Sequence, residues 1–205
     1  MSRFNPDSVP SQFESKEAEE KWSRVWEDAA VYRYSDESTA PSYVIDTPPP
    51  TVSGSLHVGH VFSYTQTDVI ARYQRMRGRN VFYPMGWDDN GLPTERRVQN
   101  YFHVRCEPLA PAFDVSKLEQ ADDATRKLPP RKLQRGAFID LCVKLTAEDE
   151  KAFKALWQRL GLSVDWSQEY STISEPSRRL AQFSFPDLFE QKHVYTVAAP
   201  TMRAV

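Results

Sequence analysis

The sequence has few cysteines and no long apolar run. Only 2 of its 205 residues are cysteine, Cys106 and Cys142, too few for a disulfide framework or a cysteine-based metal site. We expect both to be free thiols in a reducing cytoplasm. No apolar stretch approaches the roughly 20 residues that cross a bilayer, and the N-terminal run MSRFNPDSVPSQFESKE lacks the apolar core of a signal peptide. We therefore expect a cytoplasmic protein with no membrane partner.

The sequence also lacks an excess of charge of either sign. Its 26 lysines and arginines against 28 aspartates and glutamates give a formal net charge of −2. Such a chain has no global attraction to nucleic acid, so any contact with RNA must be local. A composition that is 40% hydrophobic and 26% charged is typical of a globular protein, and 205 residues can bury one sizeable core.

The most informative stretch runs from residue 43 to residue 95 and begins with the pattern of a βαβ unit. A short β-rich run at 43–45 predicts a buried strand, and three prolines at 48–50 end it because proline donates no ladder hydrogen bond. A glycine-containing turn then leads to a helix that should end near Met76, followed by a second buried strand at 81–83. This order predicts one crossover of a parallel sheet.

Two histidines, His57 and His60, lie where this helix should begin. A helix N-terminus presents free N–H groups and about half a positive charge, so it binds phosphate. Histidine there adds donors that can stabilise charge developing on a reacting phosphate. Gly59 between them leaves room for a flat ring against the backbone. One such histidine is most often an ordinary surface or core residue, but the pair, directly after a strand and a turn, indicates a nucleotide site.

The loop GWDDNGLPTE, residues 86–95, follows the second strand and carries three carboxylates. In open α/β sheets ligands bind at the carboxyl ends of the strands. A carboxylate there can hold the α-ammonium of an amino acid through a charge-assisted hydrogen bond. Without this context, Asp88 would more often be a turn residue or a helix cap. Pro93 is well placed to start a helix that runs to about Phe102.

Together these motifs resemble the class I aminoacyl-tRNA synthetases. HVGH matches the histidine-x-glycine-histidine signature of that family, and GWDDNGLPTE matches a second block of its valine, isoleucine and leucine subgroup. The runs PPPTVSG and DDNGLPTERRVQNYF are most similar to the valyl-tRNA synthetases, and the resemblance extends to about Pro200. It implies an α/β fold: the first half of a Rossmann-like parallel sheet with flanking helices, truncated before the editing insertion.

The resemblance also implies a site and a reaction. The implied catalytic residues are His57 and His60. The implied ATP-binding residues are Ser55, His57, Gly59 and His60. The implied valine-binding residues are Thr47, Pro48, Pro49 and Asp88. The complete enzyme would activate valine with ATP, with magnesium on the phosphates, and ligate it to tRNA(Val); no residue is expected to hold a metal.

We expect four parts in the chain: an N-terminal arm and helix (1–42), the nucleotide- and amino-acid-binding βαβ core (43–103), an exposed insertion without periodicity (104–135), and a helical segment returning to the core with a last strand (136–205). In the first part, Trp22 and Trp26 on a helix over 15–30 predict core packing. In the last, Pro186 should kink or break a helix, and 194–197 predicts a short strand.

Four arginines near the end of the central helix form a local basic cluster: Arg72, Arg75, Arg77 and Arg79. Positive charge at a helix C-terminus is favourable, so a solvated helix end is the expected role of this cluster. Contact with the acceptor end of tRNA is the alternative.

The chain ends shortly after the point where the family continues into an editing insertion, a lysine-bearing second signature and an anticodon-binding domain. We therefore expect a half sheet that is marginally stable or self-associates through its incomplete edge. Three alternatives stay open. The chain could be a small autonomous nucleotidyltransferase with the same helix start, or a non-catalytic synthetase-derived fragment. It could also be specific for isoleucine or leucine, since a hydrophobic pocket discriminates weakly between side chains that differ by one methylene.

Overall fold

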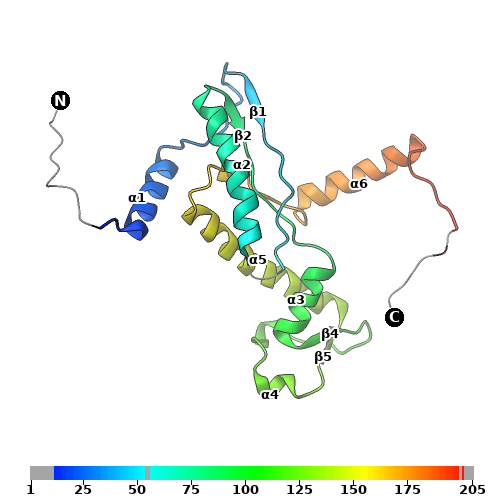
Figure 1. The fold of residues 1–205 in the computed structure, drawn as a ribbon. Helices are drawn as coiled ribbons and strands as arrows, with labels where there is room; N and C mark the ends of the chain where they lie inside the picture. Colours follow the sequence, from blue (N-terminus) through cyan, green and yellow to red (C-terminus); the bar gives the residue numbers. More distant parts are fainter. Residues whose placement is uncertain (1–11, 54–55, 199, 201–205) are drawn as a thin grey trace, which may run out of the picture.

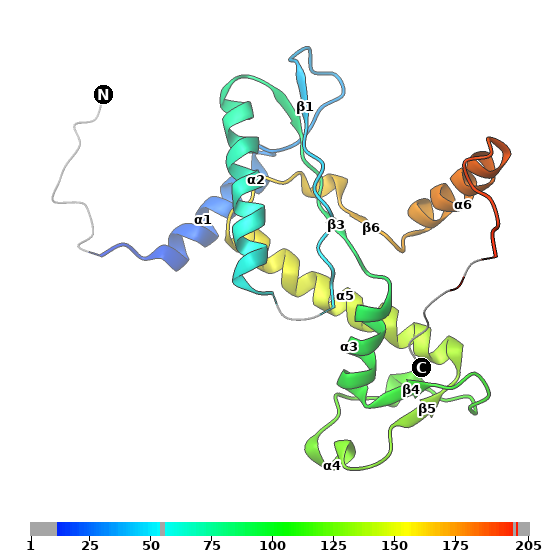
Figure 2. The same cartoon turned by 45° about the vertical axis from the view of Figure 1, so that its right-hand side comes forward.

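The computed structural model describes residues 12–53, 56–198 and 200, and arranges them around a small parallel sheet (Figure 1). Two long helices cover one face of this sheet. A second, smaller unit surrounds the N-terminal end of the longer helix, where Figure 2 shows it below the sheet. The candidate site therefore has to be sought along the sheet and its two covering helices.

The central segment of the sheet, residues 80–88, lies between two others. On one side β1 (Ser42–Val44) pairs with β2 (Asn80–Phe82). On the other side β3 (Gly86–Trp87), which follows β2, pairs with β6 (Tyr170–Ser171). Both pairs are parallel, which confirms the predicted α/β class.

Hydrogen bonds extend this pairing past the ends of the short strands. Val52 N–H donates to Asp88 O at 3.0 Å, and Thr51 forms an isolated parallel bridge with Asp88. From the other side, Thr172 N–H donates to Trp87 O at 3.0 Å. The carboxyl end of the central segment is thus fixed by both of its neighbours.

The crossover between β1 and β2 is the predicted helix, α2 (Val58–Met76). It ends as expected, because Gly78 has a φ of 77°, which glycine adopts without strain. A single helix, α5 (Arg135–Arg159), covers the same face beside it, in the part of the chain where a helical segment is predicted. Among the described helices, none combines the length and apolarity needed to cross a membrane.

The main core lies between the sheet and these two helices. Its largest buried side chains alternate along the central segment or come from α5: Tyr83, Met85, Trp87 and Trp157. Tyr64 of α2 stacks on Trp157 with ring centroids 4.9 Å apart. On the opposite face of the sheet, Val44 is 63% exposed. In the described part of the chain the sheet is therefore covered mainly on one face, so the prediction of a buried first strand holds for one face only.

Helix α1 (Ser15–Asp28) packs on the end of α5. Ser23 Oγ donates to Gln158 O at 3.1 Å. Trp26 is half-buried, whereas Trp22 is 48% exposed. The prediction that both tryptophans pack in the core is therefore wrong for Trp22, since α1 contacts α5 along a narrow strip.

The basic end of α2 folds inward around the buried carboxylate of Asp68. Asp68 Oδ1 accepts from Ser163 N–H at 2.6 Å, and Asp68 Oδ2 accepts from Arg72 Nε at 2.7 Å. Arg72 also donates to Gly161 O, and Arg75 donates to Ser163 Oγ at 2.6 Å. The predicted solvated helix end is thus wrong for Arg72 and Arg75, which connect α2 to the loop that enters the third segment of the sheet.

A second core forms where the sequence predicts an exposed, aperiodic insertion. There α3 (Leu92–Phe102) leads into β4 (Val104–Cys106), which pairs in parallel with β5 (Arg131–Leu133). Val104 and Leu133 are buried against α3 and α5. Two short helical turns lie between the strands: η2 (Val115–Lys117) and α4 (Asp123–Arg126). The expected insertion is therefore ordered, and Val104 at its start and Leu133 near its end belong to a core that extends beyond both expected boundaries.

The last part of the chain differs most from the prediction. After the 3-10 turn η3 (Trp166–Gln168) and β6, helix α6 (Glu175–Glu190) begins with Ser174 as its N-cap. It continues through Pro186, and it projects away from the core without a buried residue (Figures 1 and 2). Residues 194–197 form no strand, so the predicted last strand is wrong, whereas α5 and β6 of the same predicted part do pack against the core.

We predict that Asp68→Ala lowers the free energy of unfolding by about 3 kcal/mol, because the change leaves two donors of Ser163 and the Arg72 guanidinium without their acceptor. Urea denaturation of the chain measures this. Asp140→Ala, at an exposed helical position, is the control and should change stability by less than about 0.5 kcal/mol. Equal effects of the two substitutions would contradict the central role of Asp68.

Candidate active site

The two predicted histidines cap the start of α2 and contact each other. His57 is the N-cap, with extended backbone (φ −131°, ψ 167°), and its Nδ1 accepts from Gly59 N–H at 3.2 Å. His60 Nδ1 in turn accepts from His57 N–H at 3.4 Å. The ring centroids are 4.0 Å apart. This is a capping box made of two imidazoles, so both rings are held at the positive end of the helix.

Gly59 is required by this arrangement. A Cβ at Gly59 would lie 3.0 Å from both Cε1 and Nδ1 of His57. Such contacts are tighter than normal packing, so any side chain here would displace the imidazole. The absence of a side chain at Gly59 thus leaves room for the imidazole ring of His57. Ser55, the fourth predicted ATP-binding residue, lies outside the described residues.

His60 is the more enclosed of the two histidines. It is half-buried, and its ring meets Phe153 of α5 edge to face at 6.1 Å. Partial burial, and then the neighbouring His57, lower the pKa of His60 below its usual 6.5. At neutral pH the ring is therefore mostly uncharged, and one of its nitrogens can donate a proton in a hydrogen bond.

Asp88 lies at the carboxyl end of the central segment, half-buried. Its backbone N–H donates to Pro50 O at 2.9 Å, and one of its carboxylate oxygens accepts from Thr51 Oγ1 at 3.1 Å. The sequence did not single out Thr51. These contacts orient the carboxylate at the edge of the sheet where α/β proteins bind ligands.

The other predicted valine-binding residues, Thr47, Pro48 and Pro49, lie in the segment that runs from β1 toward Asp88. The Pro48 carbonyl accepts from the Tyr64 hydroxyl at 2.7 Å, which fixes this segment to α2. Burial raises the pKa of Tyr64, so the phenol remains a donor throughout the usual pH range. The predicted amino-acid residues therefore occupy one continuous edge.

Phe153 connects the two halves of the site. Its ring lies 6.1 Å from His60 and 6.4 Å from Trp87, the residue before Asp88, in edge-to-face contacts. The histidine pair and the acidic loop thus pack against the same side chain of α5. The structure brings together the two motifs that the sequence predicted separately.

Tyr170 is a site residue that the sequence analysis missed. A Cβ at Gly86 would lie only 2.3 Å from Cζ of Tyr170, so the tyrosine ring covers a position that must be glycine. Burial and the charge of Asp46 raise the pKa of Tyr170, which indicates that the phenol also faces the residue before Thr47. Gly86 was visible in the sequence as a position where a close neighbour can require glycine. The sequence could not identify that neighbour, because Tyr170 lies 84 residues further along the chain.

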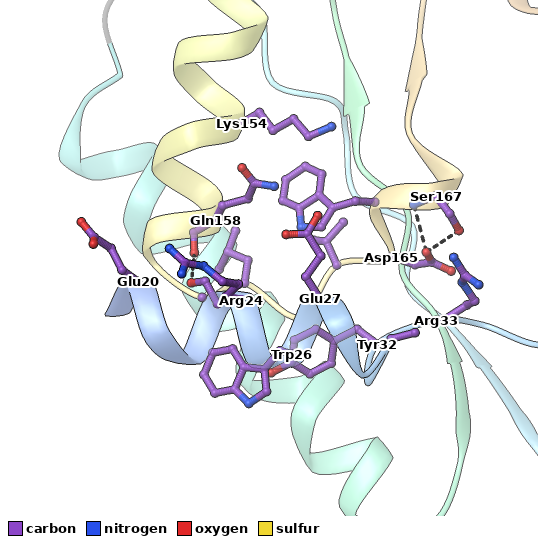
Figure 3. A pocket seen from close by; sticks show the side chains of 16 residues that line it. Glu20, Arg24, Trp26, Glu27, Tyr32, Arg33, Lys154, Gln158, Asp165 and Ser167 are labelled. Atoms are coloured by element: carbon purple, nitrogen blue, oxygen red, sulfur yellow. Dashed lines mark hydrogen bonds between the residues drawn. The ribbon is translucent and has the colours of Figure 1, made fainter. Parts of the chain in front are cut away.

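A hollow of about 550 Å³ lies elsewhere, between α1, α5 and residues 161–167 (Figure 3). Its lining mixes acidic, basic and aromatic side chains, including Glu27, Arg33, Lys154 and Trp166. Asp165 N–H, at its edge, bonds to Tyr83 O, before the carboxyl end of the central segment. The hollow is therefore separate from the edge that carries the predicted site, and we assign the chemistry to that edge because the converging polar groups are there.

A cluster of three or more metal-ligating side chains is not found among the described residues. The candidate site offers neutral imidazole and one half-buried carboxylate. This donor set suits a ligand that carries its own phosphates and ammonium group better than it suits a resident metal ion.

We predict that His60 titrates below 6.5 and that His57→Gln moves its midpoint only partly back toward that value, because burial, the larger cause, remains. The folded chain binds the His60 proton less readily than the unfolded chain, so this site contributes stability at neutral pH that is lost on acidification. NMR titration of the imidazole signals measures the midpoints. His103→Gln, beside Leu128 rather than His57, is the control; a His60 midpoint at or above 6.5 would contradict the assignment.

The chain is similar to known proteins over most of its length. The family model described as tRNA synthetases class I (I, L, M and V) matches residues 21–202. Over 196 residues the chain is 54% identical to the valine--tRNA ligase of Salinispora tropica, covering 95% of this chain and 22% of that protein. The valine--tRNA ligase of Cutibacterium acnes is 52% identical over 198 residues, with the same two coverages.

A solved structure shares the fold. The leucyl-tRNA synthetase (LeuRS) in the ternary complex of Agrobacterium radiobacter K84 agnB2 LeuRS with tRNA and LeuAMS superposes with a TM-score of 0.66 at 24% identity. The match covers 90% of this chain and 19% of the LeuRS chain. The chain thus spans about a fifth of the length of the proteins it matches. It belongs to the class I aminoacyl-tRNA synthetases of the isoleucine, leucine, methionine and valine group, and it has their Rossmann-like fold.

Proposed function

We propose that this chain provides the ATP- and valine-binding edge of a valine--tRNA ligase. The observation that carries the proposal is that Phe153 contacts both His60, the partner of His57, and Trp87, the residue before Asp88, at the carboxyl edge of a parallel sheet. The identity of about half of all residues to valine--tRNA ligases supports valine over the other amino acids of the group. Its two free thiols fit a reducing compartment, the cytoplasm.

The first step of the proposed reaction is the activation of valine. A carboxylate oxygen of valine attacks the α-phosphorus of ATP in line, the bond from that phosphorus to the β-phosphate bridging oxygen breaks, and pyrophosphate leaves. Valyl-adenylate is the product. Magnesium would arrive on the ATP phosphates as part of the substrate. Such a reaction depends on positioning and on stabilising charge at the phosphate, which imidazole donors at a helix N-terminus can do.

Within this chain, each part of the edge has a separate role. The neutral imidazole of His60 and its partner His57 would donate to the phosphate oxygens. Asp88, oriented by Thr51, would hold the valine ammonium through a charge-assisted hydrogen bond. The segment from Thr47 to Pro49 would place the side chain and carboxylate of valine. In the second step, which we propose for the complete enzyme, a hydroxyl of the 3′-terminal ribose of tRNA(Val) attacks the valyl carbonyl, the bond from that carbonyl to the phosphate oxygen breaks, and AMP leaves.

We predict that the exchange of pyrophosphate into ATP depends on valine and falls about 100-fold in His60→Ala, by analogy with the loss of one preorganised donor to a developing oxyanion. Asp88→Asn should raise the valine KM about tenfold or more and leave the ATP KM within twofold, because it removes only the charged partner of the ammonium. Asp187→Asn on α6 is the matched control.

The exchange assay should be run on this chain and on a full-length relative that carries the same substitutions. Equal exchange with isoleucine or leucine would refute the valine assignment. Exchange in the full-length protein that His60→Ala leaves intact would refute the site.

We also propose that the chain, when alone in solution, associates with a second copy through β1. Pro41 O and Ile45 N–H bond to the central segment, so the backbone groups of Val44 point to the outer edge, where no described strand pairs with them. Exposed apolar side chains line one side of the neighbouring α2: Val58, Phe62, Val69, Tyr73 and Met76. Together they leave an unpaired strand beside an apolar stripe.

We predict that sedimentation velocity detects a concentration-dependent dimer and that Val44→Lys weakens it at least about tenfold, because a lysine on an edge strand opposes edge pairing. Val143→Lys, at a position of similar exposure on α5, should leave the dimer unchanged. A chain that stays monomeric at every concentration, or equal effects of the two lysines, would contradict the proposal.

A further inference from the structure

Asp89, the residue after the proposed ammonium ligand, is itself buried and incompletely bonded. Its side chain is 3% exposed. Its backbone N–H donates to Thr172 Oγ1 at 3.2 Å, and its Oδ2 accepts from the hydroxyl of Ser171. Its Oδ1 is buried and has no hydrogen-bond partner among the described residues. A buried carboxylate oxygen without a donor is rare in folded proteins and needs an explanation.

Glu150 lies about one turn before Phe153 on α5, and Phe153 contacts Trp87, two residues before Asp89. This placement puts Glu150 on the side of α5 that faces Asp89. Burial, then the neighbouring Asp89 carboxylate, and then the charge of Glu169 raise the pKa of Glu150 to about 7, while Lys154 opposes the shift. A protonated Glu150 carries the O–H donor that Asp89 Oδ1 lacks. One proton on Glu150 therefore accounts for both the unpartnered oxygen of Asp89 and the raised pKa of Glu150.

The charges around Glu150 favour retention of that proton. The titratable groups that face it are Asp89, Glu169 and Lys154. Lys154 is already bonded to Glu169, which also accepts from Trp87 Nε1 at 2.7 Å. With every group ionised, three carboxylates would share one ammonium. One bound proton removes part of this excess negative charge where solvent access is limited.

We propose that Asp89 and Glu150 share one proton, and that this pair positions Asp88 for the substrate ammonium. Only the role of Asp88 rests on the proposed function; the pair itself rests on geometry. Asp88 is bonded to the first segment of the sheet through Pro50 and Val52, whereas Asp89 is bonded to the third segment. Asp89 and Glu150 therefore hold the second side of the peptide that carries Asp88. Neither is a catalytic residue, since neither needs to touch substrate.

Loss of the shared proton should weaken the contacts that fix the peptide carrying Asp88. The folded chain keeps the Glu150 proton to a higher pH than the unfolded chain does, so the stabilisation is present at low pH and is lost as the pH rises through about 7. Above that pH, two adjacent carboxylates repel each other and Oδ1 loses its donor. The bonds of Asp88 N–H to Pro50 and of Val52 N–H to Asp88 should then open more often.

The test is amide hydrogen exchange at Asp88 and Val52 in the 205-residue chain without ligand, measured as protection factors at pH 6 and pH 8. Wild-type protection at both amides should fall at least about threefold between the two pH values. Glu150→Gln, whose neutral amide still donates, should keep the pH 6 protection at both. Glu150→Ala should lower protection about tenfold at pH 6, within the range for a buried acceptor that loses its donor. Glu148→Ala, two residues away on the exposed side of α5, should match wild type.

Two results would overturn the proposal: a pH dependence of protection in Glu150→Gln equal to that of wild type, or protection in Glu150→Ala equal to that in Glu148→Ala. Valine binding is measured separately by calorimetry on the same variants. Where wild type binds valine, Glu150→Ala should weaken binding about tenfold and Glu150→Gln by no more than about threefold. Absence of valine binding together with the expected exchange pattern would refute the proposed function and leave the proton-sharing pair established.

Discussion

The fold depends on the buried carboxylate of Asp68. It accepts both donors of Ser163 and pairs with Arg72, so it connects the crossover helix α2 to the loop that begins the third segment of the sheet. Asp68 and Ser163 are 95 residues apart in the sequence, so bringing them together costs loop-closure entropy. Loss of this contact should therefore be visible as a loss of stability. The contact holds the loop from which the third segment starts, and backbone hydrogen bonds from Asp165, Tyr170 and Thr172 to the central segment then set the register.

That register determines the candidate site. The third segment supplies Ser171 and Thr172 beside Asp89, and it supplies Tyr170 above Gly86. The first segment supplies Thr51 to Asp88. Helix α5 adds Phe153, which contacts His60 and Trp87. Each half of the site is thus held by an element distant in sequence, as expected where ligand groups must be fixed by rigid surroundings.

Local sequence signals predicted the helix boundaries well, whereas contacts between residues distant in the sequence were not predicted. The helix end near Met76 and the helix start at Pro93 were predicted correctly, because caps and breakers act within one turn. Pairing of β4 with β5 was missed, since parallel strands share no local signal across the residues between them. The break at Pro186 was wrong because α6 is exposed, so the carbonyl that loses its donor still meets solvent. Likewise His57, His60 and Asp88 came from motifs, but Glu150 and Tyr170 required the fold.

The most direct test of the account is calorimetric titration of this chain with a sulfamoyl analogue of valyl-adenylate. NMR signals of His60 and of the Asp88 amide should be followed in the same samples. The account predicts one binding site per chain, weaker binding of the leucyl and isoleucyl analogues, and shifts of both signals at the same saturation. Binding that leaves either signal unmoved, or the absence of binding in a full-length relative as well, would contradict it.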